Sequence, residues 1–314
     1  MKAFHRYNVR VVSTALLFNL YCTAVSQDLD PRAYLRTPVH LNSVITGFTY
    51  SNGDVVTDPT LPIKNIKAQV QFASLGYNRT FSLFGLGAQA LVVMPWSWAQ
   101  VSGEVNEQQG RVTRSGLADM RARLSVLWHN GKAVDAASLR NAPRKTLLGA
   151  SINISAPTGQ FFSDKLVNIG TNRWSFRPEM AISQPIGKKW IVDFYPGVWF
   201  FTTNSHFYPG NSIRKQKPLG TLQGHISYNF NPLMWVAFNM TYYTGGTSSI
   251  NDDYKDDRQS NFRVGITGVF PTGKKSSIKL AASTGAIVRV GQDFSSYSIS
   301  WNHFWLDKGK KKGK

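Results

Sequence analysis

Cysteine is almost absent from the sequence: Cys22 is the only one among 314 residues. It falls within a segment that we expect to be removed on export, so the mature protein would contain no thiol. That excludes disulfides, thiolate metal sites and cysteine nucleophiles. Leu20 and Tyr21 stand before Cys22, where a lipoprotein would have small residues, so a lipid anchor at Cys22 is not expected either.

The export segment is predicted from the first residues of the chain. The first ten residues carry three cations, and residues 11–20 form a mostly apolar stretch that is too short to span a bilayer. A small-x-small sequence then ends at Ser26, which suits cleavage by a signal peptidase. We therefore expect residues 1–26 to be a signal peptide.

Long hydrophobic runs are also absent. After the signal peptide, no segment approaches the roughly 18 apolar residues that a membrane-spanning helix needs. The mean hydropathy is only −0.23, although the chain has 9 Trp, 12 Tyr and 19 Phe. This combination is typical of a transmembrane β-barrel, in which only alternate residues face the lipid.

Acidic residues are scarce, with 17 Asp and Glu against 36 Lys and Arg. The net charge of +19 falls to +16 when the three signal cations are removed. A basic chain can bind nucleic acid, but these cations are spread along the whole sequence and export separates them from nucleic acid. Lipopolysaccharide phosphates and anionic solutes are the expected partners, and nucleic acid is not.

Alternation of apolar and polar residues recurs throughout the mature sequence, as expected for strands with two different faces. In residues 118–128, the apolar side chains from Ala118 to Trp128 share one face. Asp119 and Arg121 lie on the other face, together with Arg123. The same alternation appears in 172–182 and 278–290, and nine further strands complete the set: 42–50, 66–78, 84–98, 146–156, 190–201, 219–230, 233–243, 261–270 and 294–305.

Twelve strands, an even number, suit a bacterial outer-membrane protein. The predicted fold class is therefore all-β: a single transmembrane antiparallel up-and-down β-barrel over residues 42–305. A periplasmic lead-in is expected at 27–41 and a basic C-terminal tail at 306–314. The predicted localisation is the cell outer membrane.

Connections of two lengths orient this barrel. Short turns suit the periplasmic side and long loops the cell exterior. The long loops are expected at 51–63, 99–114, 159–171, 203–217 and 245–259, while the connection at 129–144 is long for a periplasmic turn.

The apolar strand faces are predicted to point outward, because the lumen of a twelve-stranded barrel is too wide for side chains to fill. Aromatic residues gather at the strand ends, as in interfacial girdles. These residues are Trp96, Trp98, Trp128, Trp174, Trp190, Phe230, Tyr242 and Trp305. Pro178 and Pro196 also fall on this face, where we expect β-bulges or strand ends because proline removes a ladder donor.

Four segments of the sequence bear on the family of the protein: Asp30-Pro31-Arg32-Ala33-Tyr34 with Pro38-Val39, Arg114-Ser115-Gly116-Leu117-Ala118-Asp119, Gly170-Thr171-Asn172-Arg173-Trp174-Ser175-Phe176-Arg177-Pro178-Glu179, and Gly197-Val198-Trp199-Phe200-Phe201. Together they resemble a known family, the MetA-pathway phenol-degradation proteins, which are outer-membrane barrels described as transporters. The resemblance runs from about Asp30 to Trp305 and implies a barrel with a role in solute uptake; it implies no catalytic residues.

The charged residues on the inward faces form the candidate solute-contacting site. Seven cations against three anions would give a net charge of +4, which would favour anions over cations in the lumen. The nine residues expected to contact solute are Asp119, Arg121, Arg123, Arg173, Arg177, Glu179, Arg263, Lys279 and Arg289, and Asp193 is the remaining anion. If the strands face each other suitably, these side chains could instead form ion pairs that brace the wall.

Three other features have competing interpretations. The segment from Asp30 to Pro38 is expected to be a short ordered lead-in, and a constriction inside the lumen is the alternative. The acidic loop 252–257 is expected to be a solvated external tip and not a calcium site, because it lacks the Gly and the final Glu of a calcium loop. A third set, His225, Ser227 and Asn239, resembles the catalytic set of outer-membrane phospholipase A, but our face assignment places it in the lumen.

The sequence therefore predicts a channel for passive uptake of small anionic or aromatic solutes through a cation-lined lumen, and not an enzyme. Neither a cofactor nor a metal is expected. The predicted partners are outer-membrane lipid, lipopolysaccharide, the barrel assembly machinery and a small-molecule solute. A phospholipase-like hydrolase and a closed, non-conducting structural barrel are the alternatives.

Overall fold

The computed structural model describes residues 29–56, 63–105, 108–140 and 142–307. The predicted signal peptide and residues 308–314 of the predicted tail lie outside this part of the chain. Among the residues that are described, no helix is long and apolar enough to cross a membrane.

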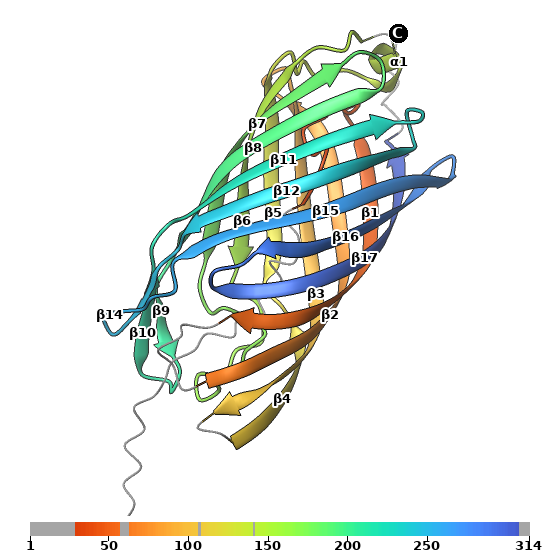
Figure 1. Cartoon of the computed structure of the whole chain (residues 1–314). Helices are drawn as coiled ribbons and strands as arrows, with labels where there is room; N and C mark the ends of the chain where they lie inside the picture. Colours follow the sequence, from red (N-terminus) through yellow and green to blue (C-terminus); the bar gives the residue numbers. More distant parts are fainter. Residues whose placement is uncertain (1–28, 57–62, 106–107, 141, 308–314) are drawn as a thin grey trace, which may run out of the picture.

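Twelve antiparallel strands form a closed barrel (Figure 1). The first strand, β1 (Leu41–Val56), pairs with the last, β17 (Gly291–Leu306), along its whole length, and this pairing closes the wall. Between them, in chain order, come β2 (Ile63–Leu83), β3 (Leu86–Val105), β4 (Gln108–Leu117) with β5 (Met120–His129), β6 (Leu147–Ala156), β7 (Ser175–Ile186), β8 (Trp190–Phe201), β11 (Leu219–Asn229), β12 (Trp235–Gly245), β15 (Gln259–Gly273) and β16 (Ser276–Ile287). The predicted twelve-stranded barrel is confirmed.

β4 and β5 are two parts of one wall strand, since both pair with β3 and follow each other along it. The register against β3 shifts by one residue between them, as at a β-bulge. At this break the Ala118 amide donates to the carbonyl oxygen of Pro95 (2.9 Å). The predicted loop at 99–114 is therefore wrong, because most of that segment continues the β3–β4 hairpin.

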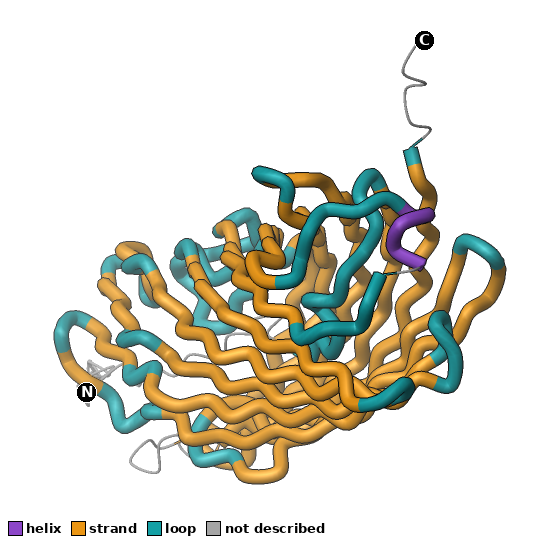
Figure 2. The backbone as a smooth tube through the Cα atoms, turned by 90° about the horizontal axis from the view of Figure 1, so that it is seen from above, coloured by secondary structure: helices purple, strands orange, loops and turns teal. Residues whose placement is uncertain are grey.

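The two ends of the barrel differ, as the connection lengths predicted. The short helix α1 (Ala136–Arg140) lies in the long β5–β6 connection, near the end of β17 (Figures 1 and 2). The Asp135 carboxylate caps it by accepting from the Ser138 amide (2.7 Å). At the opposite end the loops form a small four-stranded sheet of β9 (Asn204–Phe207), β10 (Ser212–Gln216), β13 (Ser248–Ile250) and β14 (Asp253–Tyr254).

The strand faces point as predicted. Large apolar side chains at mid-strand are exposed on the outside, among them Phe238 and Ile266, and Trp128 and Trp190 are 46% and 47% exposed at strand ends. Polar residues such as Ser97 and Asn239 are fully buried on the inside. This inversion of the usual distribution suits a wall with lipid outside it.

The two wall prolines lie inside strands, and neither a bulge nor a strand end accommodates them. Pro178 is paired with Ile152 on β6, and Pro196 is paired with Leu222 on β11. Between β7 and β8 the register is constant, but pairing is interrupted at both prolines. The expectation of bulges or strand ends was wrong: the two missing N–H donors fall in the same ladder, which simply skips those positions.

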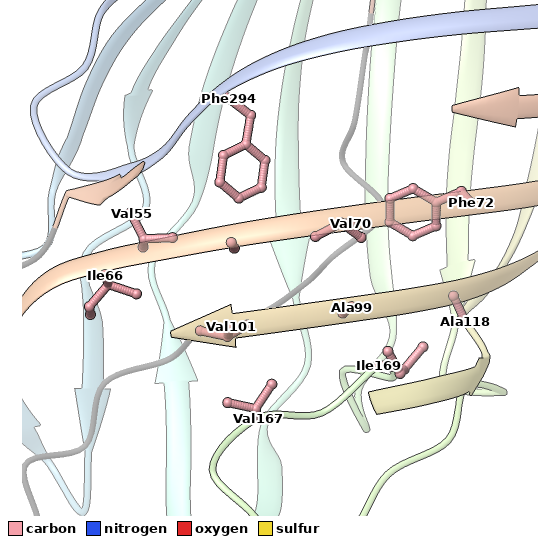
Figure 3. Packing of buried hydrophobic residues seen from close by; sticks show 11 residues of the cluster. Val55, Ile66, Val70, Phe72, Ala99, Val101, Ala118, Val167, Ile169 and Phe294 are labelled. Atoms are coloured by element: carbon pink, nitrogen blue, oxygen red, sulfur yellow. The ribbon is translucent and has the colours of Figure 1, made fainter. Parts of the chain in front are cut away.

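An apolar cluster lies on the inner side of the wall (Figure 3). Val70 on β2 and Val101 on β3 contribute to it, and Val167 and Ile169 join them from the loop between β6 and β7. The predicted external loop 159–171 therefore folds inward and packs against the wall. The remaining buried members are Val55, Ile66, Ala68, Phe72, Ala99, Ala118 and Phe294.

A cation on the outer face should destabilise the protein. Ile266 lies at the middle of β15 and is 62% exposed, so Ile266→Lys would place a charge in the lipid and lower the free energy of unfolding by about 2–4 kcal/mol. Urea unfolding in phospholipid vesicles measures the change. Tyr254→Lys in the small end sheet is the control, with an expected change of about 0.5 kcal/mol or less. Equal effects of the two substitutions would contradict the lipid-facing assignment.

Candidate functional site: the barrel lumen

The segment that precedes β1 lies inside the lumen. The Arg32 amide donates to Asp193 Oδ2 on β8 (3.2 Å), and its guanidinium Nη1 donates to Asn229 Oδ1 on β11 (2.7 Å). The Arg36 guanidinium donates to the carbonyl oxygen of Asn130, beyond β5. These contacts join the segment to several strands, so the alternative of a lumen constriction describes it better than a simple lead-in.

Asp30 connects nearly opposite sides of the wall. Its carboxylate accepts from Lys279 Nζ on β16 (2.9 Å) and from Arg123 Nη1 on β5 (3.4 Å). The side chain of Asp30 is 52% exposed, so both pairs border open space. The segment therefore crosses the lumen.

Glu179 on β7 is the centre of a buried network. One carboxylate oxygen accepts from the Tyr34 hydroxyl (2.8 Å) and from Arg123 (3.5 Å), and the other accepts from Gln223 (3.0 Å) and Arg177 (3.4 Å). The Tyr34 hydroxyl also lies 2.7 Å from Ser151 Oγ. Arg123 and Arg177 thus meet through Glu179, as the ion-pair interpretation allowed.

Two arginines of β7 and its preceding loop lie over aromatic rings of β8. The Arg173 guanidinium carbon is 4.3 Å from the centre of the Phe201 ring, and that of Arg177 is 5.0 Å from the Trp199 ring. Arg173 also donates to Gln216 Oε1 (2.5 Å). Trp199 and Phe201 were not predicted to be site residues, although alternation along β8 places them on the same face as Asp193.

Asp119 fixes the inward loop and is not positioned to meet solute. Its carboxylate accepts from the Gly159 amide (2.9 Å) and from both the amide (3.0 Å) and the hydroxyl (2.5 Å) of Thr171. The residue is buried, and these three bonds hold both ends of the loop that carries Val167. We therefore assign Asp119 a structural role in place of the predicted solute contact.

The other predicted residues lie at different heights of the lumen. Arg121 is on β5, half-buried, two residues before Arg123. Arg263 on β15 donates to the carbonyl oxygen of Phe294 (2.7 Å). Arg289 lies in the turn after β16, not in a strand as predicted, and pairs with Asp256 at the end of the barrel opposite α1 (2.8 Å). It does not line the middle of the lumen, because β16 ends at Ile287.

The predicted hydrolase set is close together but buried. His225 Nδ1 lies 2.9 Å from Asn239 Oδ1, and Asn239 donates to Thr267 Oγ1 (3.0 Å). His225 is 1% exposed and Ser227 is fully buried, both on the inner face. A phospholipid in the bilayer does not reach this face, so the arrangement gives no support to hydrolysis of membrane lipid.

The acidic loop 252–257 is held by cations and a hydroxyl. Asp252 pairs with Lys215 (2.7 Å), and the Asp257 carboxylate accepts from the Ser248 hydroxyl (2.5 Å). Asp253 pairs with Lys255. In the described part of the chain, no group of three or more His, Cys, Asp or Glu residues is placed to hold a metal ion.

A closed barrel with an apolar outer face and a charged, partly filled lumen defines a protein of the outer-membrane β-barrel class. The family model described as "Putative MetA-pathway of phenol degradation" matches residues 47–302. The chain belongs to this family, as the resemblance of its sequence segments predicted. A search of curated proteins found no match.

Two solved structures show the same fold. The COG4313 outer membrane channel from Pseudomonas putida F1 superposes with a TM-score of 0.77 at 20% identity, covering 88% of this chain and 100% of that one. The β-domain of the Bordetella autotransporter Brka superposes with a TM-score of 0.50 at 10% identity, covering 85% of this chain and 100% of that domain.

Removing the charge of Glu179 should destabilise the barrel. Glu179→Gln leaves Arg123 and Arg177 without their shared carboxylate, so the free energy of unfolding should fall by about 3 kcal/mol. Urea unfolding in vesicles measures this change. Glu104→Gln, near the end of β3 that lies away from α1, is the control, expected to change stability little. A loss below about 1 kcal/mol for Glu179→Gln would mean that the network is not a stabilising centre.

Weakening Asp119 should release the inward loop. In Asp119→Asn the three hydrogen bonds to a charged acceptor weaken, and each is worth about 1.5–3 kcal/mol. Hydrogen exchange followed by mass spectrometry should show at least a roughly tenfold loss of protection in peptides containing residues 159–171. Peptides from β12 should keep their protection. Unchanged exchange in the loop would show that its apolar packing alone holds it.

Proposed function

We propose that the protein is an outer-membrane channel for passive diffusion of small aromatic carboxylates. Membership of the family and the fold shared with a structure described as an outer membrane channel support the channel role. The proposed preference for aromatic anions rests on the side chains that line the lumen of this protein.

The pairing of arginine with aromatic rings on β7 and β8 carries this proposal. The Arg173 guanidinium lies over the Phe201 ring and that of Arg177 lies over the Trp199 ring, so positive charge and aromatic groups occur together on one wall. A guanidinium binds a carboxylate through parallel hydrogen bonds. Phenyl and indole rings pack against an aromatic solute by offset or edge-to-face contacts. A solute such as benzoate would use both kinds of group.

The charge of the lumen supports an anionic solute. Arg123 and Arg177 both pair with Glu179, so this part of the wall has more cations than anions. Arginine keeps its charge at any physiological pH. Excess positive charge along a pore raises the local concentration of anions and repels cations.

The protein would reach the outer membrane by export and insertion through the barrel assembly machinery. Phospholipid and lipopolysaccharide would then surround its apolar outer face, whose exposed tryptophans Trp96, Trp98, Trp128 and Trp190 suit the interfacial zones.

A closed structural barrel is the second candidate, and the filling of the lumen favours it. The N-terminal segment crosses the lumen at one level, and the loop that carries Val167 and Ile169 packs inside at another. A barrel that keeps both elements in place would resist the passage of solute. Conductance separates the two candidates.

Single-channel recording in planar bilayers tests the proposal. Under a potassium chloride gradient we expect steps of current whose reversal potential shows anion selectivity, and a potassium benzoate gradient should also give a measurable anion current. Replacing the guanidinium of Arg177 (Arg177→Gln) should lower the benzoate permeability relative to chloride by about threefold or more, because one charge–ring pair is lost.

Arg289→Gln at the exterior rim is the matched control, and the permeability ratio should stay within experimental error. Absence of current from protein that shifts on gels when boiled would support the closed barrel. Cation selectivity would retain a channel but would contradict a preference for anions.

A further inference from the structure

The N-terminal segment presents its own carboxylate to the cations that line the lumen. Asp30 is bound by Lys279 from one side and by Arg123 from nearly the opposite side, at 2.9 and 3.4 Å. Nothing else in the described part of the segment is acidic. Lys279 and Arg123 are therefore arranged to bind a carboxylate, and the carboxylate that they bind belongs to the same chain.

Asp30 is the exposed residue of a segment that is otherwise well held. Leu29 and Pro31 beside it are buried, the Arg32 amide is bonded to Asp193 (3.2 Å), and Tyr34 is 2% exposed with its hydroxyl bound to Glu179. The side chain of Asp30 is half exposed, and that of Lys279 is 34% exposed. Ion pairs that border water contribute about 0–1 kcal/mol each, so the side chain of Asp30 can leave its partners while the backbone stays in place.

The charge of Asp30 is permanent under physiological conditions. Partial removal from bulk water opposes its ionisation, but Lys279 and Arg123 outweigh this effect and hold the pKa of Asp30 at about 2. Protonation therefore does not release the side chain of Asp30 at neutral or mildly acidic pH. Release needs another anion that competes for the same cations.

We propose that Lys279 and Arg123 form a carboxylate-binding site that Asp30 occupies in the resting barrel, and that an incoming solute carboxylate displaces the side chain of Asp30. The inference rests on the proposed function, because the displacing anion is the transported solute. Leu29, Arg32 and Tyr34 remain anchored during the exchange, so only the side chain of Asp30 turns aside. The solute would thus open its own path.

Single-channel recording with and without benzoate tests the proposal on the wild-type protein. In potassium chloride the open probability should be low, and millimolar benzoate should raise it several-fold. Benzamide has the same shape but no charge, and it should leave the open probability unchanged. An equal response to benzamide would overturn the proposal, because the carboxylate would then play no part.

Asp30→Asn provides the matched variant, since the amide keeps the size of the side chain but forms no ion pair. Its open probability without benzoate should be several-fold above that of the wild type, and benzoate should add nothing further. Lys279→Gln should behave in the same way. Asp164→Asn, which alters an exposed acid of the β6–β7 loop paired with Lys165, should keep the wild-type response. A shift on gels between boiled and unboiled samples establishes that each variant is folded.

Two failures can be told apart. If every folded variant, including Asp30→Asn, carries no anion current, the proposed channel function fails and this inference fails with it. If anion currents are present but Asp30→Asn opens and responds to benzoate like the wild type, the channel stands and the role of Asp30 is overturned.

Discussion

The structure depends on satisfying every backbone hydrogen bond of the wall without help from water. In a hydrocarbon environment an unpaired N–H or C=O costs several kcal/mol, so strands can cross only as a closed sheet. The pairing of β1 with β17 provides that closure. The irregular positions also keep most of their backbone pairing. At the bulge between β4 and β5, both segments stay paired with β3. The gaps at Pro178 and Pro196 fall between β7 and β8, while the β6–β7 and β8–β11 ladders stay paired.

Closure of twelve strands creates the next problem, a lumen too wide for the wall side chains to fill. The chain solves it with two segments from outside the strands. The N-terminal segment joins β5, β8 and β16 through Arg123, Asp193 and Lys279, and the β6–β7 loop packs Val167 and Ile169 on the inner face. The buried charge of Glu179 is stabilised because its carboxylate accepts from two arginines, a tyrosine and a glutamine.

The same arrangement bears on function. A filled lumen is compatible with conduction only if part of the filling can move, and the structure distinguishes the well-buried Tyr34 from the half-exposed Asp30 in this respect. Under the proposed function, the pairs of Arg173 with Phe201 and of Arg177 with Trp199 would form the part of the wall that aromatic anions contact. The selectivity for solutes would then arise from fixed groups of the barrel wall. Entry of solute into the lumen would depend on Asp30, which competes with the solute for Lys279 and Arg123.

The features of the fold and site that could be predicted are those that depend on residues close together in the sequence. Alternation with a period of two is a local property, so residues 118–128 and their counterparts identified the strands, their outward face and the all-β barrel. The segments around Arg173 and Trp199 were also sufficient to indicate the family. Asp119 shows the limit: its alternation placed it correctly on the inner face, yet its partners are Gly159 and Thr171, some forty and fifty residues away.

The sequence by itself therefore determined the barrel, because lipid outside and water inside impose a face on every strand residue by residue. Only the tertiary structure decided what occupies the lumen. Whether Asp30 meets Lys279, or Tyr34 meets Glu179, depends on how strands far apart in the chain are brought round into one wall, and on how two non-strand segments fold within it. Such contacts leave no periodic trace in the sequence, since each involves a single residue at each end.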